Sequence, residues 1–170
     1  PGAFTGVRIG TSVAQGLALG ANLPLIAVSS LAVLAQGSYR QTGNENCLAA
    51  LDARMAEVYF GVYQLNDDNL MMAVQEDRVS AADQLVIVNE SIQIAEQIKW
   101  QAIGPGWNNY PDTMAERFKH WLLQQPPELV YPQAIDLLSL AVWHYDQGDR
   151  LDPSDALPVY IRDQVVRLGK

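Results

Sequence analysis

The chain has 170 residues, of which 49% are hydrophobic and 18% are charged, so it can bury a substantial core in one domain or two small ones. Its net charge is −8, from 19 acidic and 11 basic residues, which argues against a broad phosphate-binding surface. The single cysteine, Cys47, excludes an intrachain disulfide and is expected to be a buried structural thiol. No apolar run reaches the roughly 18 residues that a membrane span needs.

The first twenty residues predict a short loop and then an apolar helix that begins at about Thr5. Small residues recur every four positions in this helix and line one side of it, beside a stripe of larger apolar residues. The small stripe contains Gly6, Gly10, Ala14 and Ala18, and the larger stripe contains Ile9, Val13 and Leu17. Each interior glycine costs a helix about 1 kcal/mol relative to alanine. We therefore expect this face to pack closely, either on the protein's own sheet or on a helix of another subunit.

The loop at the start of this helix is also a candidate anion-binding site. Gly2 and Gly6 enclose the loop, and Arg8 follows one turn into the helix, so backbone amides and a guanidinium could face an anion. The alternative is a tight turn in which Arg8 pairs with a carboxylate of the same protein. The loop contains no lysine, and the sequence leaves both interpretations open.

The elements that follow are typical of an α/β sheet. Leu25 to Val28 predicts a short strand, and Ser29 or Ser30 predicts the N-cap of a helix. A polar, turn-rich run then predicts a boundary between residues 1–43 and residues 44–170. A meander of three antiparallel strands is expected next, at Leu48–Leu51, Glu57–Tyr63 and Leu70–Val74.

The second half of the chain predicts alternating helices and strands. Ser80 with Asp83 favours the start of a helix, although residues 85–88 are equally consistent with a strand. The later elements are expected as a strand at Trp100–Ile103, a helix at Thr113–Leu123, a strand at Leu129–Tyr131 and a helix at about 133–147. The last helix has an apolar side formed by Ile135, Leu138, Val142 and Tyr145. This order of elements is that of an RNase H-like lobe.

The sequence contains no recognisable motif of catalytic or metal-binding residues. Asp52 ends an apolar strand just before a hairpin, where an ATPase would need glycine amides for phosphate, but no glycine follows it. Arg54 is expected to form an ion pair with Asp52 or Glu57. His120 and His144 are far apart in the sequence and form no metal-binding pair. We therefore expect no metal, no cofactor and no catalytic residue in this chain.

Residues 1–20, PGAFTGVRIGTSVAQGLALG, closely resemble the GRGPGSFTGLRIG signature of the TsaB family, also called YeaZ, of bacterial tRNA threonylcarbamoyladenosine biosynthesis proteins. The resemblance continues in the family's order through residues 23–37 (LPLIAVSSLAVLAQG), 48–63 (LAALDARMAEVYFGVY) and 157–163 (LPVYIRD). Ala3 stands where the family usually has serine. Family members begin with a strand-rich segment and a helix before this motif, so the resemblance implies that a chain starting at Pro1 lacks part of a first lobe.

The resemblance implies an α/β fold of the actin-like and sugar-kinase-like (ASKHA) superfamily, built from two RNase H-like lobes. Residues 1–43 would be the remnant of the first lobe, and residues 44–170 the second lobe with a C-terminal tail. That tail is expected to pack back across the lobes, with Tyr160 as a rigid anchor.

The resemblance also implies a function, that of a cytoplasmic, non-catalytic scaffold for the TsaD transferase. TsaB would pair with TsaD through first-lobe helices, so the two stripes named above would be the partner-binding residues, and TsaB would form a homodimer when TsaD is absent. TsaC and TsaE would be functional partners that make the transferred group and hydrolyse nucleotide, and tRNA would be met only through the complex. The alternatives are a stand-alone actin-like ATPase and a glycoprotease-like peptidase.

Overall fold

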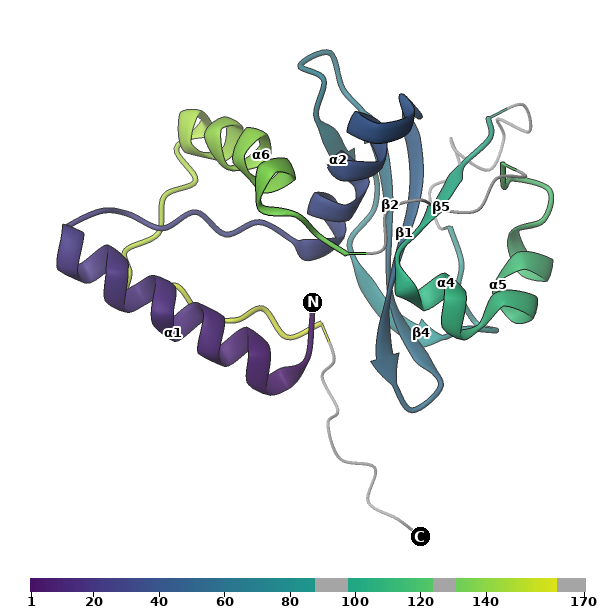
Figure 1. Ribbon diagram of the computed structural model, residues 1–170, viewed down its shortest axis with the longest axis horizontal. Helices are drawn as coiled ribbons and strands as arrows, with labels where there is room; N and C mark the ends of the chain where they lie inside the picture. Colours follow the sequence, from purple (N-terminus) through teal and green to yellow (C-terminus); the bar gives the residue numbers. More distant parts are fainter. Residues whose placement is uncertain (88–97, 124–130, 162–170) are drawn as a thin grey trace, which may run out of the picture.

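The computed structural model of the protein describes residues 1–87, 98–123 and 131–161 (Figure 1). Its helices are α1 (Phe4–Ala21), α2 (Ser30–Thr42), α4 (Pro105–Asn109), α5 (Pro111–Phe118) and α6 (Ala134–Gln147). Its strands are β1 (Asn46–Arg54), β2 (Glu57–Leu65), β3 (Met71–Ala73), β4 (Arg78–Ala81) and β5 (Gln101–Ile103). The structure is therefore an α/β fold, in agreement with the class expected from the sequence.

The five strands form one mixed sheet. Four of them lie in the order β3-β2-β1-β5, and β4 pairs with β2 beyond the end of β3. The β1–β2, β2–β3 and β2–β4 pairs are antiparallel, whereas β5 runs parallel to β1. The predicted meander is confirmed, and β1 and β2 are longer than predicted.

Helices cover both faces of this sheet (Figure 1). On one face α2 packs through Leu31 and Leu34 against a core that includes Cys47 and Tyr63. On the other face α4 and α5 cover a larger core. The largest side chains of this second core are Phe60, Trp100, Trp107, Met114 and Phe118. Apolar residues point to both sides of β1 and β2, as expected for strands buried on both faces.

Helix α2 begins where the sequence predicts it. Ser29 is the N-cap, and its Oγ accepts a hydrogen bond of 3.2 Å from the Leu31 amide. The helix ends at Gly43, whose φ of +72° is the left-handed conformation that glycine adopts without strain. The predicted strand at Leu25–Val28 is wrong. Only Leu25 pairs in it, through an isolated antiparallel bridge to Leu151, because no strand among the described residues lies beside the rest.

The helix predicted from Ser80 and Asp83 is also wrong. Arg78–Ala81 forms β4 instead, because it pairs with Glu57–Phe60 of β2 and this long-range pairing outweighs a weak local cap. Residues 85–87 are not a strand, and residue 88 lies outside the described residues. After β5 the chain forms a short helix, α4, which begins at Pro105 and was not predicted from the sequence.

Two predictions in the last third of the chain need correction. Helix α5 ends at Phe118 rather than Leu123, because the chain turns and Leu122 forms a bridge to Trp100. Of the strand predicted at Leu129–Tyr131, residues 129 and 130 lie outside the described residues, and Tyr131 is not in a strand.

Helix α6 matches its predicted range, but its predicted apolar side is exposed. Ile135, Leu138 and Val142 are each about 60% exposed, at 61%, 61% and 60%, while Asp136 and Leu140 face α2 and are buried. The side of α6 that packs on α2 therefore carries the Asp136–Arg40 ion pair and Leu140, not the predicted apolar side. None of the helices in the described part of the chain has the length and apolarity needed to cross a bilayer.

Candidate binding surface on helix α1

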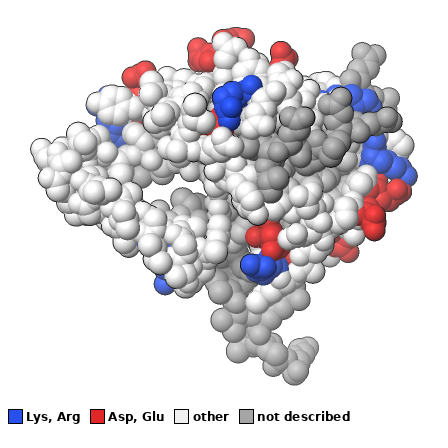
Figure 2. Space-filling model, viewed as in Figure 1, with Lys and Arg blue, Asp and Glu red and all other residues white. Residues whose placement is uncertain are grey.

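Helix α1 stands away from the sheet and its covering helices (Figure 1). The helix has no side-chain N-cap, and it ends at Asn22, whose φ of +53° is left-handed. Arg8 is the only charged residue in its 18 positions. In Figure 2 the surface over α1 is accordingly almost free of charge, whereas charged side chains gather elsewhere on the molecule. A helix without a charged outer face is typical of a buried position, so its exposure here requires an explanation.

One face of α1 is an exposed apolar surface. Ile9, Val13 and Leu17 are 60%, 56% and 71% exposed. No other part of the described structure packs against the glycines beside them, because a Cβ placed at Gly10 or Gly16 would have nothing within 4 Å beyond its own stretch of helix. The close packing that would justify these glycines is therefore not supplied by the described part of the chain.

The structure brings most of the predicted partner-binding residues together. Gly6, Ile9, Gly10, Val13 and Leu17 share this exposed face, which we call the open face of α1. Ala14 is half-buried at its edge. Ala18 is only 6% exposed and lies at the other side of the helix, so the small stripe winds from the open face to a covered one.

The covered side of α1 carries residues 151–161, which we call the strap. Gln15 donates hydrogen bonds from Nε2 to the carbonyl oxygens of Pro153, at 2.9 Å, and Ala156, at 3.1 Å. Near the other end of the helix, Arg8 Nε donates to the Tyr160 hydroxyl at 2.8 Å. Tyr160 thus anchors the strap on α1, whereas the packing of the tail across two lobes stays a prediction. A hollow of about 350 Å³ lies between the end of α1 and the start of the strap, lined in part by Ala18.

In the candidate anion-binding loop, the Arg8 guanidinium already contacts other side chains of the protein. The Arg8 guanidinium carbon lies 3.8 Å from the centroid of the Phe4 ring and 5.7 Å from that of Tyr160. Gly2 is close to Val7, because a Cβ at Gly2 would lie 3.1 Å from Val7 Cγ2. Within the described residues Arg8 therefore contacts an aromatic pair rather than a carboxylate. The anion-binding role of Gly2, Gly6 and Arg8 stays a prediction.

The hairpin between β1 and β2 has the predicted ion pair. Arg54 Nη1 lies 3.3 Å from Asp52 Oδ2, and the Arg54 amide donates to Asp52 Oδ1 at 2.9 Å. Arg54, Met55 and Ala56 all have positive φ although none is glycine. Both carboxylate oxygens of Asp52 therefore contact Arg54 within the turn.

The histidines and the cysteine form no reactive constellation among the described residues. His144 Nδ1 lies 2.8 Å from Asp149 Oδ2 on the surface, and no group of three potential metal ligands occurs in residues 1–87, 98–123 and 131–161. Cys47 is fully buried, and this burial raises the pKa of its thiol well above the ordinary value, an effect that Ser38 opposes more weakly. The thiol is therefore protonated and poorly nucleophilic at neutral pH.

Two features of this region were not predicted from the sequence. One is that the apolar side of α6 is uncovered, and the other is the role of Gln15, whose partners lie 138 and 141 positions along the chain. Helical spacing identified the apolar side of α6 but carried no signal of the direction in which that side faces. The second carried no local signal.

Comparison with known proteins gives a consistent result. Residues 1–125 match the family model described as TsaD, tRNA N6-adenosine threonylcarbamoyltransferase. The chain is 40% identical over 165 residues to the tRNA threonylcarbamoyladenosine biosynthesis protein TsaB of Escherichia coli, covering 97% of this chain and 68% of that protein. TsaB of Haemophilus influenzae is 32% identical over 168 residues, again covering 97% and 68%.

Two solved structures from Pseudomonas aeruginosa have the same fold. One is described as an uncharacterized protein with similarity to peptidase YEAZ, with a TM-score of 0.78 at 38% identity over 95% of this chain and 70% of that one. The other is described as YeaZ, with a TM-score of 0.76 at 38% identity over 94% and 71%.

Proposed function

Because the chain belongs to the TsaB family of tRNA threonylcarbamoyladenosine biosynthesis proteins, we propose that it is the non-catalytic scaffold that binds and supports the TsaD transferase. The observation that carries this proposal is the open face of α1. Apolar side chains and unfilled glycines lie there together on a nearly uncharged helix. Such a face suits the close approach of a second helix.

The proposed partner face consists of the two stripes, Gly6, Ile9, Gly10, Val13, Ala14, Leu17 and Ala18. The open-face members would contact TsaD directly, and the buried Ala18 would support the helix from behind. When TsaD is absent, the same face would pair with a second copy of this chain, because a symmetric contact needs only a self-complementary patch. The two assemblies would then compete.

We also propose a two-lobed architecture of the ASKHA type, with residues 1–43 in a first lobe and residues 44–170 in a second. The uncovered faces support two lobes, and α2, which belongs to residues 1–43, would form the contact between them through its packing on the sheet. The apolar side of α6 and the face of α1 lie outside the two cores of the sheet, in the part of the molecule where the chain between α1 and α2 runs extended (Figure 1). A first lobe with its own sheet would give such helices a surface to cover.

The division of labour in the pathway follows from the same proposal. TsaC would make the threonylcarbamoyl donor, TsaE would hydrolyse nucleotide, and TsaD would transfer the group to tRNA in the cytoplasm, with this chain meeting tRNA only in the complex. The net charge of −8 supports the view that this chain contributes little to binding the tRNA phosphates. The alternative enzymes, an actin-like ATPase or a peptidase, predict turnover by this protein alone.

The test is a binding comparison between Gly10→Leu and two control variants. A Cβ at Gly10 would have nothing within 4 Å beyond its own helix, and leucine raises helix propensity, so the helix should stay folded while the partner is pushed away. Gly10→Ala adds only a methyl group, and Asn109→Leu adds the same side chain on α4. We expect that, of the three variants, only Gly10→Leu weakens copurification with TsaD. Unchanged copurification would show that this face does not bind TsaD.

The same samples distinguish the competing assemblies and the enzyme alternatives. Sedimentation with and without TsaD should show a homodimer that TsaD displaces, and Gly10→Leu should weaken both assemblies. ATP hydrolysis and peptide cleavage should stay at background for the protein alone. Steady turnover by the protein alone would overturn the non-catalytic proposal.

A further inference from the structure

The strap is the main lateral support of α1 in the described structure. It runs antiparallel to the helix (Figure 1). Its first residue, Leu151, exchanges two backbone hydrogen bonds of 2.9 Å with Leu25, just beyond the end of α1. Pro153 and Ala156 then meet Gln15, and Tyr160 meets Arg8 and Phe4 near the start of the helix. The strap therefore touches α1 along most of its length.

Gln15 recognises a preformed turn of the strap. Asp152 Oδ1 accepts hydrogen bonds from the Ser154 amide, at 2.9 Å, and the Ser154 hydroxyl, at 2.6 Å, and these bonds lower the pKa of Asp152. The turn is closed further by the Asp155 amide, which donates to the Asp152 carbonyl at 2.9 Å. This turn aims two backbone carbonyls at one side-chain amide, whose two hydrogens satisfy both.

Arg8 and two rings form a second contact, a latch. The Phe4 and Tyr160 ring centroids are 6.2 Å apart, and the Arg8 guanidinium lies over Phe4 while bonding the Tyr160 hydroxyl. A guanidinium stacked on an aromatic face gains cation–π energy as well as the hydrogen bond. The latch therefore ties the end of the strap to the first turns of α1.

We infer that the strap sets the orientation of α1 on the rest of the protein, and that Gln15, Arg8 and Tyr160 are positioning residues for the open face. Their contacts lie on the side of the helix away from Ile9, Val13 and Leu17, so the strap holds α1 without covering the open face. The partner-binding part of this inference rests on the proposed function. The support of α1 by the strap does not.

The test uses the full chain with the double substitution Gln15→Ala and Tyr160→Ala. The matched control is Leu157→Ala with Val159→Ala, two strap residues whose side chains are 73% and 78% exposed. We expect amide hydrogen exchange in residues 4–21 to speed up by about tenfold in the double variant and to stay unchanged in the control. Protection of β1 and β2 should stay unchanged in both, which shows that the sheet remains folded.

Affinity for purified TsaD is the second measurement. The double variant should bind about tenfold more weakly than the wild-type protein, while the control should bind as the wild type does. Unchanged amide exchange in residues 4–21 of the double variant would show that the strap does not support α1. Accelerated exchange with unchanged affinity would overturn the positioning role while the scaffold proposal stands. Failure of the wild-type protein to bind TsaD would overturn the scaffold proposal. The exchange result would still decide whether the strap supports α1.

Discussion

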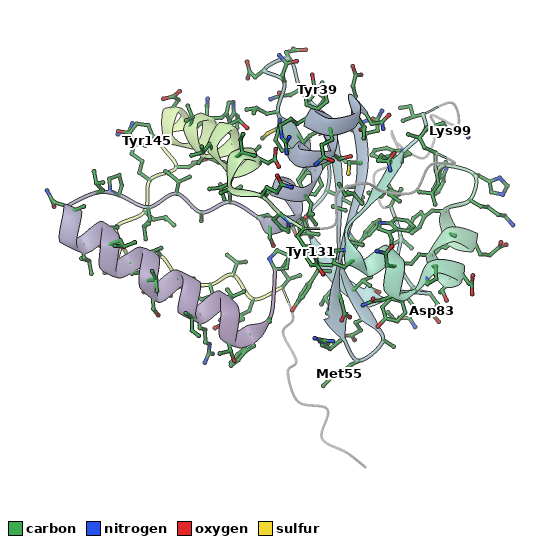
Figure 3. All side chains as sticks on the ribbon, in the orientation of Figure 1. Tyr39, Met55, Asp83, Lys99, Tyr131 and Tyr145 are labelled. Atoms are coloured by element: carbon green, nitrogen blue, oxygen red, sulfur yellow. The ribbon has the colours of Figure 1, made fainter. Side chains whose placement is uncertain are left out.

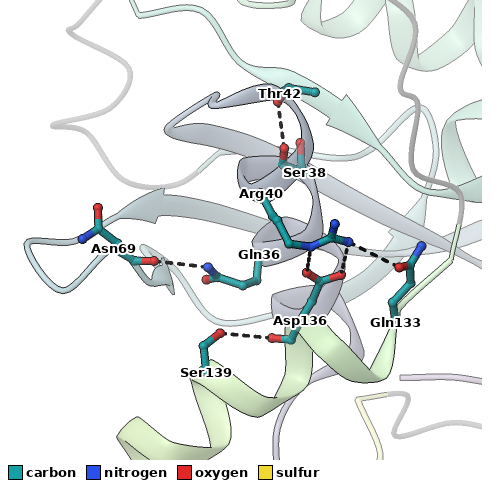
Figure 4. Close-up of polar contacts among 8 residues, drawn as sticks. All are labelled: Gln36, Ser38, Arg40, Thr42, Asn69, Gln133, Asp136 and Ser139. Carbon is teal, nitrogen blue, oxygen red and sulfur yellow. Dashed lines mark hydrogen bonds and ion pairs between the residues drawn. The ribbon is translucent and has the colours of Figure 1, made fainter.

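The guanidinium of Arg40 and the carboxylate of Asp136 join α2 to α6 across 96 positions of the chain (Figure 4). Arg40 Nε lies 2.6 Å from Asp136 Oδ1 and Nη2 lies 3.1 Å from Oδ2, so the pair is bidentate. The Asp136 side chain is only 1% exposed, whereas that of Arg40 is 42% exposed. Arg40 therefore brings a charge to a carboxylate that water scarcely reaches.

Removing the Arg40 guanidinium should destabilise the protein, because Asp136 would keep a buried charge without its partner. Arg40→Met preserves much of the side-chain length and is expected to lower the midpoint of urea unfolding clearly. The control is Arg54→Met, which removes an ion pair whose arginine is 87% exposed and should leave the midpoint within error. Equal midpoints for the two variants would show that the α2–α6 pair contributes no more than a surface ion pair.

Gly104 and Gly43 both have positive φ but differ in their surroundings. Gly104 has a φ of +99°, and a Cβ there would collide with the Ala50 carbonyl oxygen, whereas Gly43 has a φ of +72° and open space around it. Gly104→Ala should cost about 2–5 kcal/mol from strain and overpacking together, against about 1 kcal/mol for Gly43→Ala. Chemical denaturation of the two variants measures this difference. A similar small cost in both would mean that β1 and α4 move apart easily.

The sequence predicted the elements whose signals are local. The Ser29 cap indicated the start of α2, a fully apolar run located β1, and alternating apolar residues located β2. It failed where a distant strand decided the outcome, because β4 forms by pairing with β2 and Leu25 has only Leu151 to pair with. Local chemistry cannot indicate which distant strand will lie beside a segment.

The sequence likewise predicted which residues share a face of a helix, but not what that face contacts. Spacing alone identified Ile9, Val13 and Leu17 as one side of α1, and the structure places them together on its surface. Spacing also found the apolar side of α6 but not its direction, because a buried aspartate paired with Arg40 turns the opposite side inward. The partner of Arg8, Tyr160, is 152 positions away and has no signature in the loop that contains Arg8.

Alkaline pH should destabilise the protein through Cys47, which is buried in the core between α2 and the sheet. Figure 3 shows that side chains cover both faces of this sheet. Burial raises the pKa of the folded-state thiol, whereas the unfolded thiol ionises near pH ~8.5. The unfolded state thus binds fewer protons above that pH, so the stabilisation is complete below about pH 8.5 and is lost as pH rises toward the folded pKa. Between about pH 9 and pH 10 the free energy of unfolding should fall by roughly 1.4 kcal/mol per pH unit.

Cys47→Ala is the control for this prediction, because it removes the titrating group from the core. Urea unfolding of both proteins at pH 7, 8, 9 and 10, values chosen to bracket the unfolded thiol pKa of about 8.5, should show curves that diverge above that pH. Parallel curves would show that some other group causes the alkaline loss.

Leu140 and Leu138 of α6 test the orientation of that helix, which is opposite to the one its apolar pattern suggests. Leu140 is 1% exposed and packs with Val33 and Leu70, whereas Leu138 is 61% exposed. Leu140→Ala should cost about 2–5 kcal/mol in the free energy of unfolding, because it leaves a cavity, and Leu138→Ala should change it by no more than about 0.5 kcal/mol. Both substitutions are the same chemical change on one helix, so helix propensity cancels in the comparison. The reverse order of the two costs would mean that Ile135, Leu138 and Val142 are covered in solution and that α6 is rotated.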